Sequence, residues 1–257
     1  MTDYRFQQFD IRIMLDDIRF SQVGKNPLLL DYSQTVEVLD KGTVSLEALA
    51  AGRFLLVVTG SFSCPMTVSS LPELNALVGR YAQQFSPVLA YVREAHPGEH
   101  CPQADTLDEK RELARRLREE LTLDWPIVID SLEGALHQRL DIKPNSLHVF
   151  DTQGKCRFQA LWGGDFKAID QALKQLSQGQ SLKKPVREAM FWPFLRGAGF
   201  ILPVLRKAGA KARRELLIGA PPIWLLAWLA DRFRFVPLTW RGFAAAGSMV
   251  LVVLMVI

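Results

Sequence analysis

The sequence predicts a mixed α/β domain, with a central sheet flanked by helices, followed by a hydrophobic helical segment at the C-terminal end. Three short apolar runs at 54–58, 87–92 and 127–129 have the length of strands, and the first has the β-branched content of a strand buried on both faces. Segments with helical periodicity separate these runs, and a strand pair and a final helix follow. Strands that alternate with helices indicate a sheet that is at least partly parallel.

The predicted helices have recognisable starts or apolar stripes. Pro65 suits the first turn of the helix after the first strand, because its missing N–H costs nothing there. Thr106 and Glu109 have the spacing of a capping box, which opens a charged helix that ends at about Leu121. A further short helix is expected over 131–140.

The end of this region predicts a hairpin and one more helix. Two strands at 147–150 and 156–161 are separated by the sequence Asp-Thr-Gln-Gly, which is typical of a turn. Asp165 then precedes a helix with apolar residues on one face. A thioredoxin-like fold requires this order of elements: first strand, helix, strand, and later helix, strand, strand, helix.

Changes in composition divide the chain into four parts. Residues 1–35 show no clear periodicity, and we leave them unassigned. The two alternatives for this segment are an edge strand and a docking arm. Residues 36–180 form the predicted thioredoxin-like domain. Residues 181–215 are a linker followed by a basic, amphipathic segment, and residues 216–257 are a hydrophobic membrane-anchor region.

The prediction of a membrane anchor depends on two uncharged segments, 216–230 and 242–257. At about 1.5 Å per residue each covers roughly 22–24 Å, against a hydrocarbon core of about 30 Å. They would therefore span with help from flanking residues or form a shallow hairpin. Tryptophans at their flanks and basic residues at 206–214 favour a membrane surface. The alternative is a buried helical pair packed on the preceding domain.

Charge and cysteine content indicate the compartment. The net charge is only +4, and three cysteines cannot form a closed disulfide framework, which favours a reducing environment. The N-terminal residues lack the continuous apolar core of a secretory signal. With the basic cluster on the inner side, we expect the domain to lie at the cytoplasmic face of the inner membrane.

Several classes of function find no support in the sequence. It contains no phosphate-binding loop, dinucleotide fingerprint or nucleic-acid-binding motif. Its histidines and cysteines do not have the spacing of zinc ligands. We therefore expect no metal, no cofactor and no nucleic-acid partner.

Cys64 is the predicted reactive group. It follows the first buried strand by a short turn and opens a helix, where free backbone N–H groups and the helix dipole favour a thiolate. We therefore expect a lowered pKa at Cys64. In thioredoxins a second thiol sits three residues further on, but here that position is Thr67, so no local disulfide can form.

A thiol that resolves an oxidised Cys64 would then come from elsewhere. The candidates are Cys101, Cys156, a second chain or a small-molecule thiol. Cys101 is the better internal candidate, because it lies in the loop after the second strand, at the edge where active sites of such folds gather. Cys156 alternates with core positions in a strand and is expected to be structural.

Glu94 and His96 follow the second predicted strand at its C-terminal end. An imidazole near Cys64 can take the thiol proton or donate one to a leaving group, and a carboxylate can fix its tautomer. The alternative is a surface loop held by bonds from the histidine to the backbone.

Further polar residues near Cys64 are candidate supporting groups. Ser61, Ser63 and Thr67 either hydrogen-bond the sulfur and a substrate or cap the turn and the helix. Pro144 lies near the place of the cis-proline that faces the reactive cysteine in thioredoxin folds, with Asn145 as the alternative for that position.

Two segments resemble the iodothyronine deiodinase family and its bacterial relatives. They are Gly-Ser-Phe-Ser-Cys-Pro at 60–65 and Tyr-Val-Arg-Glu-Ala-His-Pro-Gly at 91–98, and the resemblance runs from about 36 to 176. It implies a thioredoxin fold, reductive or peroxide chemistry at Cys64, and functional roles for Glu94 and His96. The chain departs from that family in having cysteine where selenocysteine is common, and in carrying its apolar segment at the C-terminal end.

Three hypotheses for function follow. The first is a thiol-dependent oxidoreductase of the deiodinase-like or redoxin type, whose Cys64 thiolate acts on a peroxide, a disulfide or a halogenated compound with an external thiol as reductant. The second is a membrane-tethered thiol-disulfide exchange protein, which the missing second cysteine disfavours. The third is a non-catalytic interaction module with a thioredoxin fold.

Overall fold

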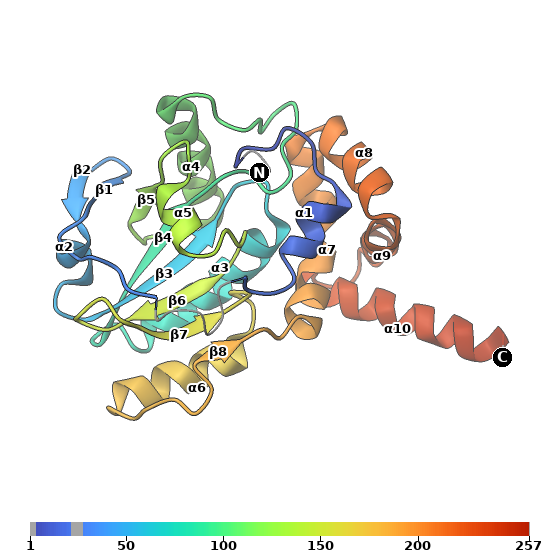
Figure 1. Ribbon diagram of the computed structural model, residues 1–257. Coiled ribbons are helices and arrows are strands. Elements are labelled where there is room, and N and C mark those ends of the chain that lie inside the picture. The colour runs from blue at the N-terminus through green and yellow to red at the C-terminus, as the bar shows by residue number, and fades with distance from the viewer. Residues whose placement is uncertain (1–3, 22–27, 257) are drawn as a thin grey trace.

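The computed structural model describes residues 4–21 and 28–256, which form a mixed sheet with helices on both faces (Figure 1). The strands are β1 (Thr35–Val38), β2 (Gly42–Ser45), β3 (Phe54–Gly60), β4 (Phe85–Tyr91), β5 (Ile127–Ile129), β6 (Leu147–Phe150), β7 (Cys156–Ala160) and β8 (Val186–Arg187). The helices are α1 (Ile11–Asp16), α2 (Leu46–Ala50), α3 (Pro65–Gly79), α4 (Leu107–Leu121), α5 (Ala135–Arg139), α6 (Phe166–Ser177), α7 (Phe191–Ala208), α8 (Ala210–Gly219), α9 (Pro221–Arg232) and α10 (Leu238–Val256).

The strand order identifies the fold. Within the described residues the sheet runs β2-β1-β5-β4-β3-β6-β7-β8. The central strand β3 pairs parallel with β4 and antiparallel with β6, and β7 continues antiparallel from β6. The unit β3-α3-β4 followed by β6-β7-α6 is the thioredoxin-like arrangement that the sequence predicts. The β1–β2 hairpin and β8 extend its two edges.

The central strand is buried on both faces, as its composition predicts. Leu56 and Val58 belong to the core on the side of α3 and α7, while Leu55 and Val57 belong to the core on the other face of the sheet. None of these four side chains is more than 1% exposed. This double burial fixes the C-terminal end of β3, from which the turn to Cys64 starts.

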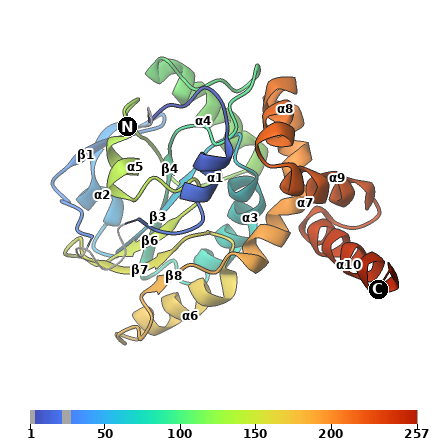
Figure 2. The same ribbon diagram turned by 45° about the vertical axis from the view of Figure 1, so that its right-hand side comes forward.

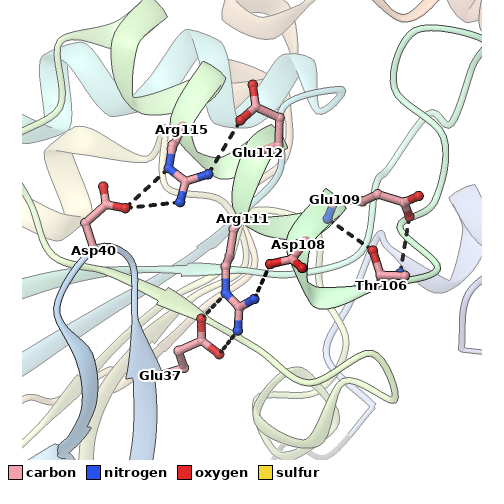
Figure 3. A network of polar contacts seen from close by, with 8 residues as sticks. All are labelled: Glu37, Asp40, Thr106, Asp108, Glu109, Arg111, Glu112 and Arg115. Atoms are coloured by element: carbon pink, nitrogen blue, oxygen red, sulfur yellow. Dashed lines mark hydrogen bonds and ion pairs between the residues drawn. The ribbon is translucent and has the colours of Figure 1, made fainter.

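Helix α4 is held at its N-terminal end and in its middle by polar contacts (Figure 3). The predicted capping box is confirmed, because Thr106 and Glu109 bond each other's backbone N–H. Further along the helix, Arg111 donates to both oxygens of Glu37 in β1, at 2.6 and 2.9 Å. Arg115 reaches Asp40 in the β1–β2 turn at 3.2 Å. These contacts fasten the edge hairpin to the helix.

The C-terminal residues pack against the thioredoxin-like unit. Helix α7 lies along α3, and α8, α9 and α10 lie on the side of α7 that faces away from the sheet (Figures 1 and 2). Leu202, Leu205 and Leu216 are buried in the same core as the sheet residues. The segment that the sequence predicts as a linker and a basic segment thus contains β8, α7 and part of α8.

The two uncharged segments differ in form from the predicted pair of anchors. The first covers the end of α8 and most of α9, and Pro221 and Pro222 lie in the first turn of α9. Across the residues that the structure describes, no helix is both long enough and apolar enough to cross a membrane.

We predict that Gly242→Ala lowers the stability of the protein by about 1–3 kcal/mol, because it overpacks a helix contact. Gly242 lies near the start of α10, and a Cβ there would overlap the Leu195 carbonyl oxygen of α7 and crowd Ala198. Thermal or urea unfolding of the full chain measures the change.

Gly247→Ala is the matched control on the same helix, since a Cβ at Gly247 meets nothing within 4 Å. It should leave stability unchanged or raise it by up to about 1 kcal/mol through helix propensity. Equal destabilisation by both substitutions would contradict the close contact between α7 and α10.

Candidate active site

Cys64 lies where the sequence predicts it, between the end of β3 and the first turn of α3. It is the N-cap residue of α3, its carbonyl accepts the Val68 N–H at 3.1 Å, and Pro65 occupies the first helical position. Its own N–H donates to the Ser61 carbonyl at 3.3 Å, which closes the turn. The side chain is only 2% exposed.

Burial decides the acidity of this thiol. It raises the pKa of Cys64 to about 11, although the Thr67 side chain and the N–H groups of Thr67 and Met66 act in the opposite direction. The prediction of a lowered pKa is therefore wrong for this conformation. The helix N-terminus does favour the thiolate. The free-energy cost of removing the charged sulfur from water, however, exceeds the stabilisation that these N–H groups supply.

Glu94 lies inside the protein and holds the residue before the cysteine. Its carboxylate accepts the Ser63 N–H at 2.8 Å and the Ser63 hydroxyl at 2.5 Å, and it also accepts the Tyr91 hydroxyl. Gln103 pairs with the Glu94 backbone through two bonds, at 2.9 and 2.8 Å. Burial raises the pKa of Glu94. The carboxylate thus anchors the turn that presents Cys64.

His96 joins the same turn through its backbone. Its N–H donates to the Ser63 hydroxyl at 3.1 Å, so Ser63 links Glu94 to His96. Its ring packs on Phe9, with centroids 4.5 Å apart, and its Nδ1 has no hydrogen-bond partner among the described residues. Burial lowers the pKa of His96 to about 4, so the ring is neutral at neutral pH.

The other predicted supporting residues have distinct positions. The Ser61 hydroxyl accepts the Ala95 N–H at 3.3 Å and so ties the turn to the Glu94–His96 loop. Thr67 is fully buried in the first turn of α3, on the side of the Cys64 sulfur.

Pro144 does not have the predicted cis geometry, since the described part of the chain contains no cis peptide bond. The adjacent Asn145 ties three segments together. Its amide donates to the Thr59 carbonyl at 3.3 Å, and its side-chain oxygen accepts the Ser70 hydroxyl at 3.1 Å and the Gly163 N–H at 3.2 Å. It therefore joins β3, α3 and the segment after β7.

All three cysteines are free. Cys101 is fully buried in the core, and burial raises its pKa to about 12. Cys156 lies on β7 with its thiol directed to the Phe158 carbonyl at 3.3 Å, and burial raises its pKa to about 12 as well. Both thiols are protonated at neutral pH.

Two segments far from Cys64 in sequence close over its surroundings. In the N-terminal arm, the Phe9 ring covers His96, while its N–H donates to Glu215 of α8 at 2.9 Å. On the other side, Gly197 of α7 faces Met66, two residues after Cys64, so closely that a Cβ would overlap the Met66 sulfur. Both segments therefore pack against residues next to the turn that contains Cys64.

Asp17 is a charged residue of this site that the sequence interpretation misses. Burial raises its pKa to about 7, while Arg93 and Lys143 act in the opposite direction. Its negative charge also raises the pKa of Cys64. It lines a cavity of about 10 Å³, room for about one water molecule, together with Ala95 and Pro144. Nothing local in the arm signals this role, because only the folded chain brings Asp17 to the cysteine.

We predict that Asp17→Asn raises stability above about pH 7 and lowers the pKa of Cys64. Because the folded-state pKa of Asp17 lies above its ordinary value, its protonated form favours folding, and stability falls as the pH rises through about 7. An uncharged amide side chain does not ionise, so the variant does not lose this stability. Thermal unfolding against pH and the rate of Cys64 alkylation measure the two effects.

Asp16→Asn is the matched control, since Asp16 is the exposed neighbour in sequence. Because Asp16 is the smallest of the named contributions to the pKa of Asp17, its substitution should change the pH dependence of unfolding and the alkylation rate much less than Asp17→Asn does. If the two substitutions act alike, Asp17 has no particular electrostatic coupling to Cys64.

Comparisons with known proteins show similarity only at the level of structure. No family model matches the chain, and no curated protein matches it. An uncharacterized conserved protein from Geobacillus kaustophilus is 17% identical with a TM-score of 0.49, over 62% of this chain and 87% of that one.

Two further structures have stated activities. A bacterioferritin comigratory protein of Xanthomonas campestris, described for alkyl peroxide reduction, is 16% identical with a TM-score of 0.44, over 58% of this chain and 98% of that one. A secreted Mycobacterium tuberculosis disulfide oxidoreductase is 11% identical with a TM-score of 0.43, over 56% of this chain and 96% of that one. At these values the similarities assign no activity to this chain.

Proposed function

We propose that the protein is a single-cysteine thiol oxidoreductase that uses Cys64 to reduce a small peroxide, with an external thiol as reductant. The observation that carries the proposal is the position of Cys64 as N-cap of α3 at the end of the central strand. The residue before it is held by Glu94 and by the His96 N–H. A cysteine kept only as a core residue would not need this buried polar anchor.

The reaction uses one thiol and balances without a second cysteine. The Cys64 sulfur attacks one oxygen of the peroxide, the O–O bond breaks, and an alcohol or water leaves with the thiol proton while the sulfur becomes a sulfenic acid. A small thiol then condenses with the sulfenic acid and releases water, giving a mixed disulfide. A second small thiol displaces Cys64, so that one peroxide is reduced and two thiols are oxidised to a disulfide.

His96 is the residue that we propose to accept the Cys64 proton. Its ring is neutral at neutral pH, its Nδ1 is unpaired within the described residues, and its backbone is bonded to the residue next to Cys64. A neutral imidazole can hold a proton during attack and return it to the leaving oxygen. Glu94 acts as a positioning residue, because its carboxylate contacts Ser63 and Tyr91.

The small exposure of the thiol favours a small oxidant. Cys64 is only 2% exposed, and the Phe9 ring packs on the neighbouring His96. A halogenated aromatic substrate, as the deiodinase-like resemblance implies, would require the Phe9 arm to move. We therefore propose the peroxide first and the halogenated compound second.

A non-catalytic role is the second candidate, and one observation favours it. Cys64 is 2% exposed and its pKa is about 11, so in this conformation the thiol is neither accessible nor ionised. An interaction module with a thioredoxin fold would need neither property. The two functions differ in whether Cys64 is ever oxidised.

We predict that the full chain consumes hydrogen peroxide in the presence of a small thiol, and that Cys64→Ser reduces the rate to background. The rate should rise with pH through the alkaline range, because ionisation of Cys64 limits attack. Mass spectrometry after trapping with dimedone should place the sulfenic acid on Cys64.

Cys156→Ser is the matched control, since Cys156 is a half-buried thiol on β7, away from the end of β3, and the variant should retain the rate. Iodide release from an iodophenol tests the deiodinase-like alternative in the same preparations. The oxidoreductase proposal fails if neither substrate turns over at any pH at which the protein stays folded and Cys64 stays reduced. That result would favour the non-catalytic interaction module.

A further inference from the structure

The C-terminal helices carry a charge opposite to that of the rest of the chain. Residues 191–257 contain nine arginines and lysines but only two acids, whereas residues 1–190 contain 22 basic and 25 acidic residues. Both acids of the C-terminal part are engaged. Asp231 forms an ion pair with Arg206, and Glu215 accepts the Phe9 N–H. Arg196 and Lys207 pair with Glu73 and Glu120 of the preceding residues, which leaves part of the positive charge available to a partner.

Two of these cations are free for external contact. Arg213 and Arg214 are exposed on α8, and neither forms an ion pair or hydrogen bond with the described residues. Arg232 on α9 and Arg234 after it are also exposed, with the Arg232 guanidinium 4.3 Å from the centroid of the Trp228 ring. Free arginines beside exposed aromatic rings are typical of groups that bind an anionic interface.

The same helices hold most of the exposed apolar side chains. Of fifteen large hydrophobic residues that are exposed among the described residues, twelve lie between 191 and 257. Phe235 is 85% exposed, and Trp192 and Trp240 are 66% and 58% exposed. Apolar exposure on this scale marks a surface that binds a partner, because isolated soluble domains rarely gather so much of it.

Aromatic rings form a cluster at the base of α10. Trp192 stacks on Phe243 at 5.7 Å between centroids, Trp240 lies 5.4 Å from Phe243, and Phe191 contacts Trp192 at 5.2 Å. We call these four residues the aromatic cluster. Tryptophan rings with one polar edge favour the boundary between lipid headgroups and hydrocarbon.

Beyond this cluster, α10 extends away from the body of the protein (Figures 1 and 2). No charged residue occurs between 242 and 257, and Val250, Leu251 and Leu254 are each more than half exposed. From Phe243 to Leu254 the helix rises by about 16 Å. One leaflet of hydrocarbon is about 15 Å thick, half of a core of about 30 Å.

We propose that the C-terminal helices bind the surface of an anionic lipid bilayer. In this arrangement the end of α10 enters one leaflet, the aromatic cluster lies at the headgroup level, and the arginines of α8 and α9 contact lipid phosphates. A second copy of the chain is disfavoured as the occupant, because it would bring two strongly basic units together. The proposal does not depend on the reaction at Cys64.

Vesicle binding of the full chain tests this proposal. We expect the protein to co-sediment with vesicles that contain phosphatidylglycerol, to bind pure phosphatidylcholine vesicles much more weakly, and to be released by salt. Replacing Arg213 and Arg214 by glutamine should weaken binding roughly 25-fold, about fivefold for each arginine. Replacing Leu251 and Leu254 by glutamate should abolish it.

Leu29→Glu is the matched control, because Leu29 is an equally exposed leucine, at 55%, far from the C-terminal helices in sequence. It should bind vesicles as the unchanged protein does, and unfolding curves should show that all variants are folded. Equal binding by the Leu251 and Leu254 variant would overturn the proposal. So would a stable dimer that this variant dissociates while vesicles bind neither form.

Discussion

The close contact between α7 and the first turn of α3 is the constraint on which the site depends. Gly197 faces Met66 with no room for a Cβ, which brings a helix from far along the chain against the turn that contains Cys64. The N-terminal arm closes the other side, where Phe9 covers His96 and bonds to Glu215. Residues of the N-terminal arm and of α7 thus pack against the neighbours of Cys64.

Burial determines the electrostatics of the site. A helix N-terminus stabilises an anion by a modest amount, whereas desolvation of a fully buried group changes its pKa by several units. Burial therefore raises the pKa values of Cys64 and Glu94 and lowers that of His96. All three groups are shifted toward their neutral forms. Within the proposed function, attack by Cys64 therefore requires the deprotonation of a thiol whose pKa is raised.

The sequence predicts the thioredoxin-like unit well because its signals are local. The apolar run of β3, the capping box of Thr106 and Glu109, and the position of Cys64 at the start of a helix each depend on a few neighbouring residues. The roles of Asp17 and Phe9 depend on contacts across most of the chain, and no local pattern marks them. The form of the C-terminal region could not be predicted either, since part of its apolar content packs on the core through contacts distant in sequence.

Burial, and not the helix N-terminus, sets the acidity of Cys64. The most direct measurement is a pH titration of the ultraviolet absorbance of the thiolate in the full chain, with Cys64→Ser subtracted. We expect a midpoint near 11, provided that the protein stays folded. A midpoint at or below about 8.5, the value of an ordinary cysteine, would show that the thiol is exposed to water or stabilised as an anion, and would contradict the account.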